Sequence, residues 1–98
     1  MYAAVRRYQF DPKHREELNQ KVQELFVPMI KKAPGFVAYY YVDSGKGAAA
    51  TFSLFDNQAG AEESTRLAAS FIKQHLASLL TKPPEITQGE VIVQATRK

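Results

Sequence analysis

Residues 36–55 read FVAYYYVDSGKGAAATFSLF, and this stretch contains the signal of a complete β-hairpin. Aromatic and β-branched residues fill 36–43, and the short segment SGKG at 44–47 has the residues that tight turns need. A second run of strand-forming residues then extends over 48–55. The stretch predicts two antiparallel strands joined by a tight turn, in the middle of the chain.

One strand and one helix are predicted before this hairpin. The segment YAAVRRYQF at 2–10 favours a strand. Over 13–32, apolar residues recur at helical spacing, which predicts an amphipathic helix that begins after Asp11-Pro12 and is kinked or shortened at Pro28. The segment Ala33-Pro34-Gly35 ends this helix.

A second helix and a fourth strand are predicted after the hairpin. Asp56 or Asn57 caps the helix, which ends before Lys82-Pro83-Pro84, and residues 85–95 favour a strand. The order β-α-β-β-α-β in one domain, residues 1–98, predicts an α+β fold. This fold is the ferredoxin-like sandwich, in which two helices cover one face of a four-stranded antiparallel sheet.

Both faces of the predicted sheet are apolar. In the strand 36–43, four residues are expected on one face, Phe36, Ala38, Tyr40 and Val42, and three on the other, Val37, Tyr39 and Tyr41. Two helices cover only one face, and a large apolar sheet face is rarely left in water. We therefore predict that two copies pack sheet to sheet as a homodimeric α/β barrel.

Composition excludes several classes of protein. The 98 residues carry 13 Lys+Arg against 10 Asp+Glu, a net charge of +3 with no run of five like charges, so nucleic acid is not an expected partner. No apolar run approaches the roughly 18 residues that span a bilayer, so a membrane is not expected either. The absence of cysteine excludes thiolate metal sites and a cysteine nucleophile, and the two histidines lie far apart in the sequence. We expect a cytoplasmic protein without a metal or a cofactor.

Several short segments resemble the dimeric α/β-barrel superfamily, and within it the small stand-alone proteins similar to antibiotic biosynthesis monooxygenases. The segments are Pro34-Gly35-Phe36, Leu54-Phe55-Asp56, the helix start AGAEES at 59–64, and Gly89-Glu90-Val91. The resemblance covers nearly the whole chain. It implies a ligand cavity between the helices and the sheet, and it implies cofactor-independent oxygenation of aromatic or quinol-type substrates.

His75 is the first candidate catalytic residue, because it falls on the apolar face of the second helix, near Phe71. The segment Phe71-Ile72-Lys73-Gln74-His75 resembles the one that carries the haem-ligating histidine in haem-degrading relatives. Those relatives also have an Asn on the first strand and a Trp early in the second helix. This chain has no Trp and no Asn in 2–10, and Ser64 falls about where the Trp would be. Haem ligation is therefore not expected. A core or cavity-edge histidine with a hydrogen-bonded partner is the alternative interpretation.

Tyr8 and Tyr40 are the other catalytic candidates, since oxygenation without a cofactor needs a base and hydrogen-bond donors to an oxyanion in a dry pocket. Tyrosines that simply pack in a sheet or a dimer interface are the alternative. Arg6, Phe71 and Ser64 are expected substrate-binding residues. Arg6 has two interpretations, a structural ion pair with a glutamate of the fourth strand or an anchor for an acidic or phenolate ligand.

The sequence leaves two functional hypotheses. The first is a homodimeric, monooxygenase-like protein that binds a small, mostly apolar ligand and oxygenates it. The second is a non-catalytic dimeric protein with a binding or stress-related role. A ligand-sized cavity beside His75 would favour the first hypothesis.

Overall fold

The computed structural model describes residues 1–97, which form four strands and two helical segments. The strands are β1 (Tyr2–Gln9), β2 (Phe36–Gly45), β3 (Ala48–Phe55) and β4 (Glu85–Glu90). The first helical segment consists of a 3₁₀ turn, η1 (Pro12–His14), then α1 (Arg15–Lys21), a π-helical turn, η2 (Val22–Phe26), and α2 (Val27–Ile30). The second consists of α3 (Gln58–Phe71) and a π-helical turn, η3 (Ile72–Leu76).

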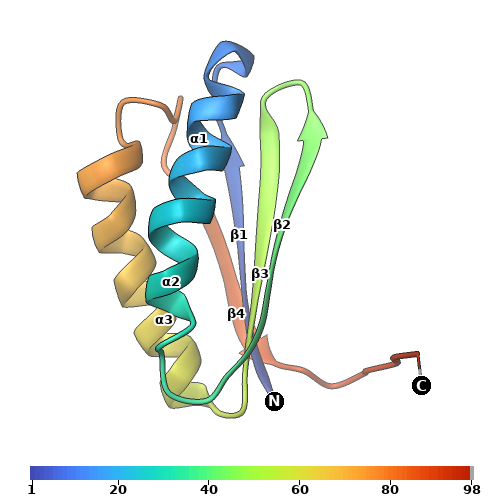
Figure 1. Ribbon diagram of the computed structural model, residues 1–98. Coiled ribbons are helices and arrows are strands. Elements are labelled where there is room, and N and C mark those ends of the chain that lie inside the picture. The colour runs from blue at the N-terminus through green and yellow to red at the C-terminus, as the bar shows by residue number, and fades with distance from the viewer. Residues whose placement is uncertain (98) are drawn as a thin grey trace.

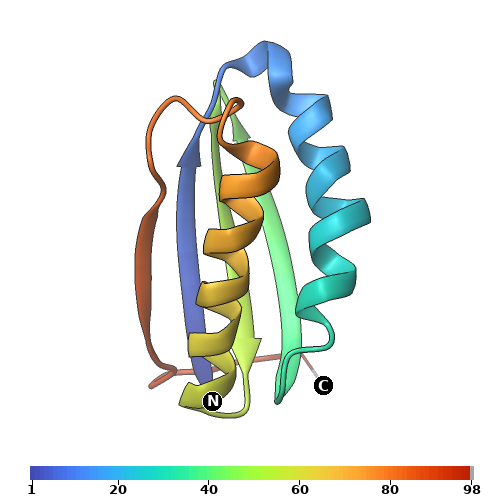
Figure 2. The same cartoon turned by 90° about the vertical axis from the view of Figure 1, so that its left-hand side faces the viewer.

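The four strands form one antiparallel sheet in the order β2-β3-β1-β4. Both helical segments lie on the same face of this sheet, and the other face is open (Figure 1). Seen through the helical layer, β4 lies at the edge of the sheet with no helix in front of it (Figure 2). The predicted ferredoxin-like α+β fold is confirmed. No helix within residues 1–97 is both long and apolar enough to cross a membrane.

The β2–β3 turn is anchored to the end of β1. Lys46 and Gly47 both have positive φ angles, 59° and 79°, as a two-residue type I′ turn requires. A Cβ atom on Gly47 would lie 2.3 Å from the carbonyl oxygen of Phe10. Since the Phe10 N–H donates to the Gly47 carbonyl at 2.9 Å, the glycine allows this close approach of two backbones.

The first helical segment passes Pro28 without ending there. Asp11 caps its start, since its Oδ1 accepts from the Lys13 N–H at 3.1 Å. One turn before the proline the helix widens, so that the Val27 N–H bonds to the Val22 carbonyl five residues back. This π-helical turn accommodates the ring of Pro28, which has no N–H and would clash in a regular helix.

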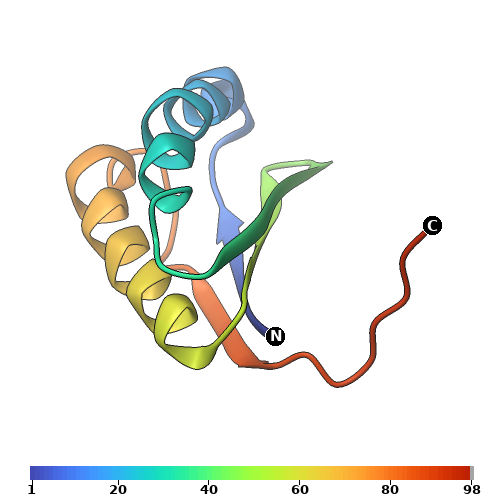
Figure 3. The ribbon, with the colours of Figure 1, turned by 60° about the horizontal axis from the view of Figure 1, so that its bottom comes forward.

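The fourth strand is shorter than the sequence predicts. The predicted strand ran over 85–95, but β4 ends at Glu90, and the last contact with β1 is the bond from the Val91 N–H to the Met1 carbonyl. Residues 91–97 continue away from the helices on the side of the open face (Figure 3). Ile92 is 88% exposed and Val93 84% exposed. The residues suit a strand, but no neighbouring strand within the described chain pairs with them.

The hydrophobic core fills the space between the helices and the sheet. Its buried members include Ile30, Phe55, Ala61, Phe71 and Leu76. Phe36 also packs against this core, although it was predicted to share a face with Tyr40. That prediction is wrong because a β-bulge between Phe36 and Ala38 shifts the alternation.

The opposite sheet surface, called the open face below, is apolar and uncovered. Tyr40 is 58% exposed, Val42 48% and Phe52 37%. Across the strands Val5, Phe52 and Tyr40 form an apolar row. In the next row Ala50 and Val42 are apolar, and the exposed Arg7 on β1 lies beside them. The predicted second apolar face is therefore present.

Candidate functional site

Three polar residues form one row across the middle of the sheet, on the face that the helices cover. Arg6 on β1 is paired with Thr51 on β3, and Thr51 is paired with Tyr41 on β2. Four buried side-chain polar atoms within residues 1–97 have no hydrogen-bond partner, and three belong to this row: Arg6 Nε, Thr51 Oγ1 and the Tyr41 hydroxyl. Since buried polar atoms are nearly always hydrogen-bonded, their concentration here marks a candidate binding site.

Arg6 is 1% exposed, and its guanidinium is surrounded by hydroxyl groups. Its Nη1 donates to Ser53 Oγ at 3.2 Å, and its Nη2 donates to Ser64 Oγ at 3.1 Å and to Thr65 Oγ1 at 3.4 Å. Burial lowers the pKa of Arg6, and the neighbouring phenols of Tyr8 and Tyr39 oppose this change. An arginine remains charged in proteins, so this site holds a buried cation.

The hydroxyls around Arg6 are held in place by their own hydrogen bonds. Ser64 Oγ donates to the Ala61 carbonyl at 2.7 Å, and Thr65 Oγ1 donates to Gln88 Oε1 at 2.5 Å. With their protons used in this way, both oxygens present lone pairs to the guanidinium. Helix α3 therefore positions Arg6, and β4 contributes through Gln88.

Three tyrosines surround the row, and burial changes their acidity. Burial raises the pKa of Tyr41 to about 12, and Asp43 adds to this change. Burial likewise raises the pKa of Tyr39 and of Tyr8, where the Arg6 charge and the neighbouring Thr51 hydroxyl oppose part of the rise. All three phenols are therefore protonated at neutral pH and can donate hydrogen bonds to a ligand, but they are poor bases.

An inner hollow lies above the row, between the helices and the sheet. Its free volume is only about 10 Å³, roughly the space of one water molecule. The polar side chains on its floor are Tyr8, Tyr39, Tyr41 and Thr51, and its walls are apolar and include Phe26, Ala68 and Phe71. The hollow has the composition of a binding site for an aromatic molecule, but in this conformation it is closed.

Two larger spaces open at the two ends of the row. At the Tyr41 end, the α1/β2 groove has about 300 Å³ and shares Val22, Tyr39 and Tyr41 with the hollow. At the Arg6 end, the α3/β4 cleft has about 290 Å³ and shares Ala68 and Ile72 with the hollow. The row thus connects two surface openings beneath the helical layer.

Both π-helical turns border the inner hollow. Val22 and Phe26 from η2, and Ile72 and Leu76 from η3, line it. Inserted π-helical turns occur frequently at functional sites, because they displace the helix backbone locally. A ligand that enters the hollow must move the helices away from the sheet. Both helices have their π-helical turns at this place.

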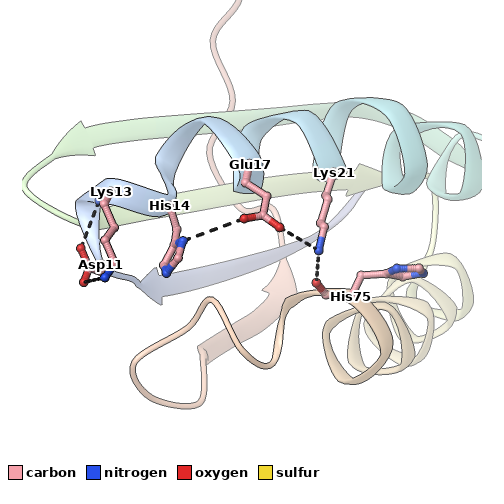
Figure 4. A network of polar contacts seen from close by, with 6 residues as sticks. All are labelled: Asp11, Lys13, His14, Glu17, Lys21 and His75. Atoms are coloured by element: carbon pink, nitrogen blue, oxygen red, sulfur yellow. Dashed lines mark hydrogen bonds and ion pairs between the residues drawn. The ribbon is translucent and has the colours of Figure 1, made fainter.

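His75 lies beside the hollow but does not line it. Its imidazole packs on the ring of Phe71, with 5.0 Å between the ring centroids. Its carbonyl accepts a hydrogen bond from Lys21 Nζ at 3.0 Å, and that amine also pairs with Glu17 at 3.3 Å. The imidazole points away from these contacts (Figure 4). No ligand-sized cavity lies beside this side chain among the spaces described here.

The structure brings some of the predicted site residues together and separates others. Tyr8 and Phe71 line the inner hollow, and Ser64 holds Arg6 at its edge. Tyr40 lies on the open face, so the sheet separates it from Tyr8 within one chain.

The predicted ion pair of Arg6 with a glutamate of β4 is wrong. Ile86 faces Arg6 across the two strands, and Glu85 faces Arg7. Within residues 1–97, Arg6 has no carboxylate within 4.0 Å and bonds to hydroxyls instead. The other interpretation of Arg6, a ligand anchor, is compatible with this geometry.

Thr51, Tyr41 and Thr65 were not singled out from the sequence. Alternation puts Tyr41 on the face opposite to Tyr40, and Thr51 on the face opposite to Phe52, which was the available signal for two of the three residues. The pairing of Thr51 with Arg6 could not be predicted from the sequence, because it depends on the register between β1 and β3. Within the described residues, no group of His, Asp and Glu is arranged to hold a metal ion.

No protein-family model and no curated protein matches the sequence. Solved structures do resemble the fold. A protein of unknown function from Nitrosomonas europaea is 21% identical with a TM-score of 0.81, over 99% of this chain and 94% of that one. A monooxygenase from Streptomyces coelicolor, solved in complex with nanaomycin D, is 18% identical with a TM-score of 0.77, over 99% and 92%.

A dimeric ferredoxin-like protein from an uncultured marine organism is 12% identical with a TM-score of 0.77, and the match covers 99% of this chain and 92% of that one. A structure described as an antibiotic biosynthesis monooxygenase is also among the matches. The chain therefore has the fold of the antibiotic biosynthesis monooxygenase-like proteins, as the sequence predicted. At these identities the similarity concerns the fold alone.

Proposed function

We propose that the protein binds a small aromatic molecule between its helices and its sheet, and that it oxygenates a phenol or quinol-type ligand without a cofactor. The observation that carries this proposal is the row of Arg6, Thr51 and Tyr41, with three buried polar atoms that lack partners. The oxygen atoms of a ligand that lies along the row would satisfy them. The apolar walls of the hollow suit the rest of an aromatic ring.

The oxygenation part of the proposal is supported by the fold shared with a monooxygenase. With an anthrone-type substrate, a ring CH₂ becomes C=O: one atom of O₂ is inserted, the other leaves as water, and the substrate supplies all the electrons. No external reductant is needed. The substrate must first lose a proton, and the resulting enolate oxygen would be stabilised by Arg6 and by the protonated phenols of the row.

This proton transfer also requires a base. The phenols are poor bases at neutral pH because burial raises the pKa of Tyr8 and of Tyr41. His75 is the candidate because histidine is the side chain that most often serves as a general base, and it packs on Phe71, which lines the hollow. Tyr40 would act only from the dimer interface.

We further propose that the open face forms a homodimer. Tyr40, Val42 and Phe52 are exposed there, and the apolar part of this face extends over β2 and β3, with Arg7 of β1 beside it. A second copy presents the same apolar surface around a two-fold axis. The cytoplasmic location stays a prediction of the sequence.

A non-catalytic binding protein is the second candidate function. One observation favours it: His75, the candidate base, does not line the hollow. Binding alone would require the row and the apolar walls, but no base.

Oxygen uptake above the protein-free rate, with a product that has gained one oxygen atom, distinguishes the two candidates when anthrone and 1,4-naphthohydroquinone are supplied in air. A hydroquinone that is merely oxidised to its quinone, with release of hydrogen peroxide, does not count. For an oxygenase we expect such uptake with one of the two substrates, and we expect His75→Ala to abolish it while His14→Ala, the matched histidine control, does not. Tyr41→Phe and Thr51→Val should weaken ligand binding about tenfold each, the effect of one lost hydrogen bond. Tyr2→Phe is their control, since its hydroxyl lines none of the three spaces. Binding without uptake would contradict the oxygenase and support the binding protein.

A further inference from the structure

The geometry points to an anionic ligand: we infer that Arg6 is the counter-ion of a small organic carboxylate whose apolar body lies in the α3/β4 cleft. This inference rests on the proposed binding of a ligand between the helices and the sheet. It adds the charge of the ligand and the opening through which it reaches the row.

The first argument is that the Arg6 charge is not compensated. Within the described chain no carboxylate lies within 4.0 Å of Arg6. Glu63 precedes the hydroxyl partner Ser64 on α3, but it pairs with Arg66 instead. A buried charge without an opposite charge costs several kcal/mol. An anion that binds at this position would recover part of that cost.

The second argument concerns hydrogen bonds. A guanidinium has five N–H donors, and the hydroxyls of Ser53, Ser64 and Thr65 accept from the two Nη atoms. The Nε–H has no acceptor. Neutral hydroxyls orient the guanidinium and leave its charge and this donor available, whereas a carboxylate would satisfy both.

The third argument is the shape and lining of the space that reaches Arg6. The α3/β4 cleft has about 290 Å³ and is lined, besides Arg6 and Thr65, by Ala68, Ala69, Ile72, Pro84 and Ile86. The side chain of Thr65 donates to that of Gln88 from α3 to β4. A small aromatic ring fits such walls, and its carboxylate would face the guanidinium.

The lining also selects the charge of the ligand. No second arginine and no lysine lines the cleft, so a single positive charge is available. A phosphate or another dianion would leave one charge without compensation in an apolar space. A monoanion with an apolar body is the class that fits.

The test compares benzoate with benzamide, which has nearly the same shape and no charge. Calorimetric titration of the full chain should show benzoate binding at least tenfold tighter than benzamide, and inorganic phosphate should not compete. Arg6→Met should weaken benzoate binding at least tenfold and benzamide binding clearly less, because benzamide loses a hydrogen bond but no ionic partner. Arg66→Met, an exposed arginine on the same helix, is the matched control and should bind benzoate like the wild type.

Equal binding of benzoate and benzamide to the wild type would overturn the anionic ligand, while the proposed binding site would stand. If neither probe binds and no quinol binds, both proposals fail. Should Arg6→Met not fold, the wild type still decides: benzoate, and not benzamide, must shift the NMR signal of the Arg6 Nε–H. An unshifted signal at saturating benzoate overturns the inference.

Discussion

Arg6 on β1 and Thr51 on β3 lie directly opposite each other, each is 1% exposed, and each keeps one polar atom without a hydrogen-bond partner. An unsatisfied buried group costs about 1–3 kcal/mol. Two such positions side by side in the middle of a sheet are not what stability alone would select, since an apolar pair would pack there at lower cost. The pair is therefore the strongest structural indication of function in this chain.

Removal of the Arg6 charge should not destabilise the protein. In Arg6→Met a long apolar side chain replaces an uncompensated buried cation, so the free energy of unfolding should stay the same or increase by about 1–2 kcal/mol. Ser64→Ala should instead lower it by about 1–3 kcal/mol, because the guanidinium loses an acceptor. Urea unfolding measures both. A large loss of stability in Arg6→Met would mean that the arginine is structural.

The buried tyrosines should make the fold sensitive to alkali. Burial raises the pKa of Tyr41 to about 12, and that of Tyr8 and Tyr39 in the same direction. The unfolded chain releases these protons near pH 10, so the folded state holds more protons above that pH. The free energy of unfolding should be constant below about pH 10 and decrease above it.

Urea unfolding between pH 8 and about pH 11.5 checks this prediction, and ultraviolet absorbance of the phenolate follows the titration. Tyr41→Phe should reduce the slope above pH 10, because one titrating group is lost. A profile that is flat to pH 11.5, or one that falls from pH 8, would contradict the assigned burial.

A charge on the open face should dissociate the proposed dimer. Phe52 on this face and Met29 on the helical layer are both 37% exposed, which makes them a matched pair. Phe52→Glu should raise the dimer dissociation constant at least a hundredfold, since a carboxylate would be buried against an apolar surface. Met29→Glu should leave it unchanged. Sedimentation equilibrium measures both constants, and a wild type that is monomeric at micromolar concentration would refute the dimer.

The segment after β4 should contribute to the same contact. Ile92 and Val93 are nearly fully exposed, and this segment runs on the side of the open face. The double variant Ile92→Ser, Val93→Ser should therefore weaken dimerisation about tenfold or more, because apolar area is lost from the interface. The unfolding of the monomer should not change. Unaltered dimerisation would show that these side chains lie outside the contact.

The architecture was predictable because it depends on local signals. Asn57 caps α3 as expected, with its Oδ1 accepting from the Gly60 N–H at 3.0 Å, and the hairpin turns at Lys46 and Gly47. Phe36 was misplaced because a β-bulge depends on the fit between two strands. The end of β4 was misplaced because a strand needs a partner as well as suitable residues.

The site was only partly predictable. Helical spacing correctly put Phe71 on the apolar, inner face of α3. Sequence alone could not tell that Arg6 faces Ile86 and not a glutamate, because a shift of one residue in register exchanges the two. Which buried polar atoms lack a hydrogen-bond partner could not be predicted either, because this depends on the packing of side chains from several elements.

The open face has a consequence for the abundance of this protein. If a second copy supplies the cover for Tyr40, Val42 and Phe52, the free energy of unfolding includes a term that depends on the concentration of the chain itself. Dilution would then melt the protein at a lower temperature. A cell that makes few copies would contain a less stable protein than one that makes many, so that the rate of synthesis becomes a determinant of folding.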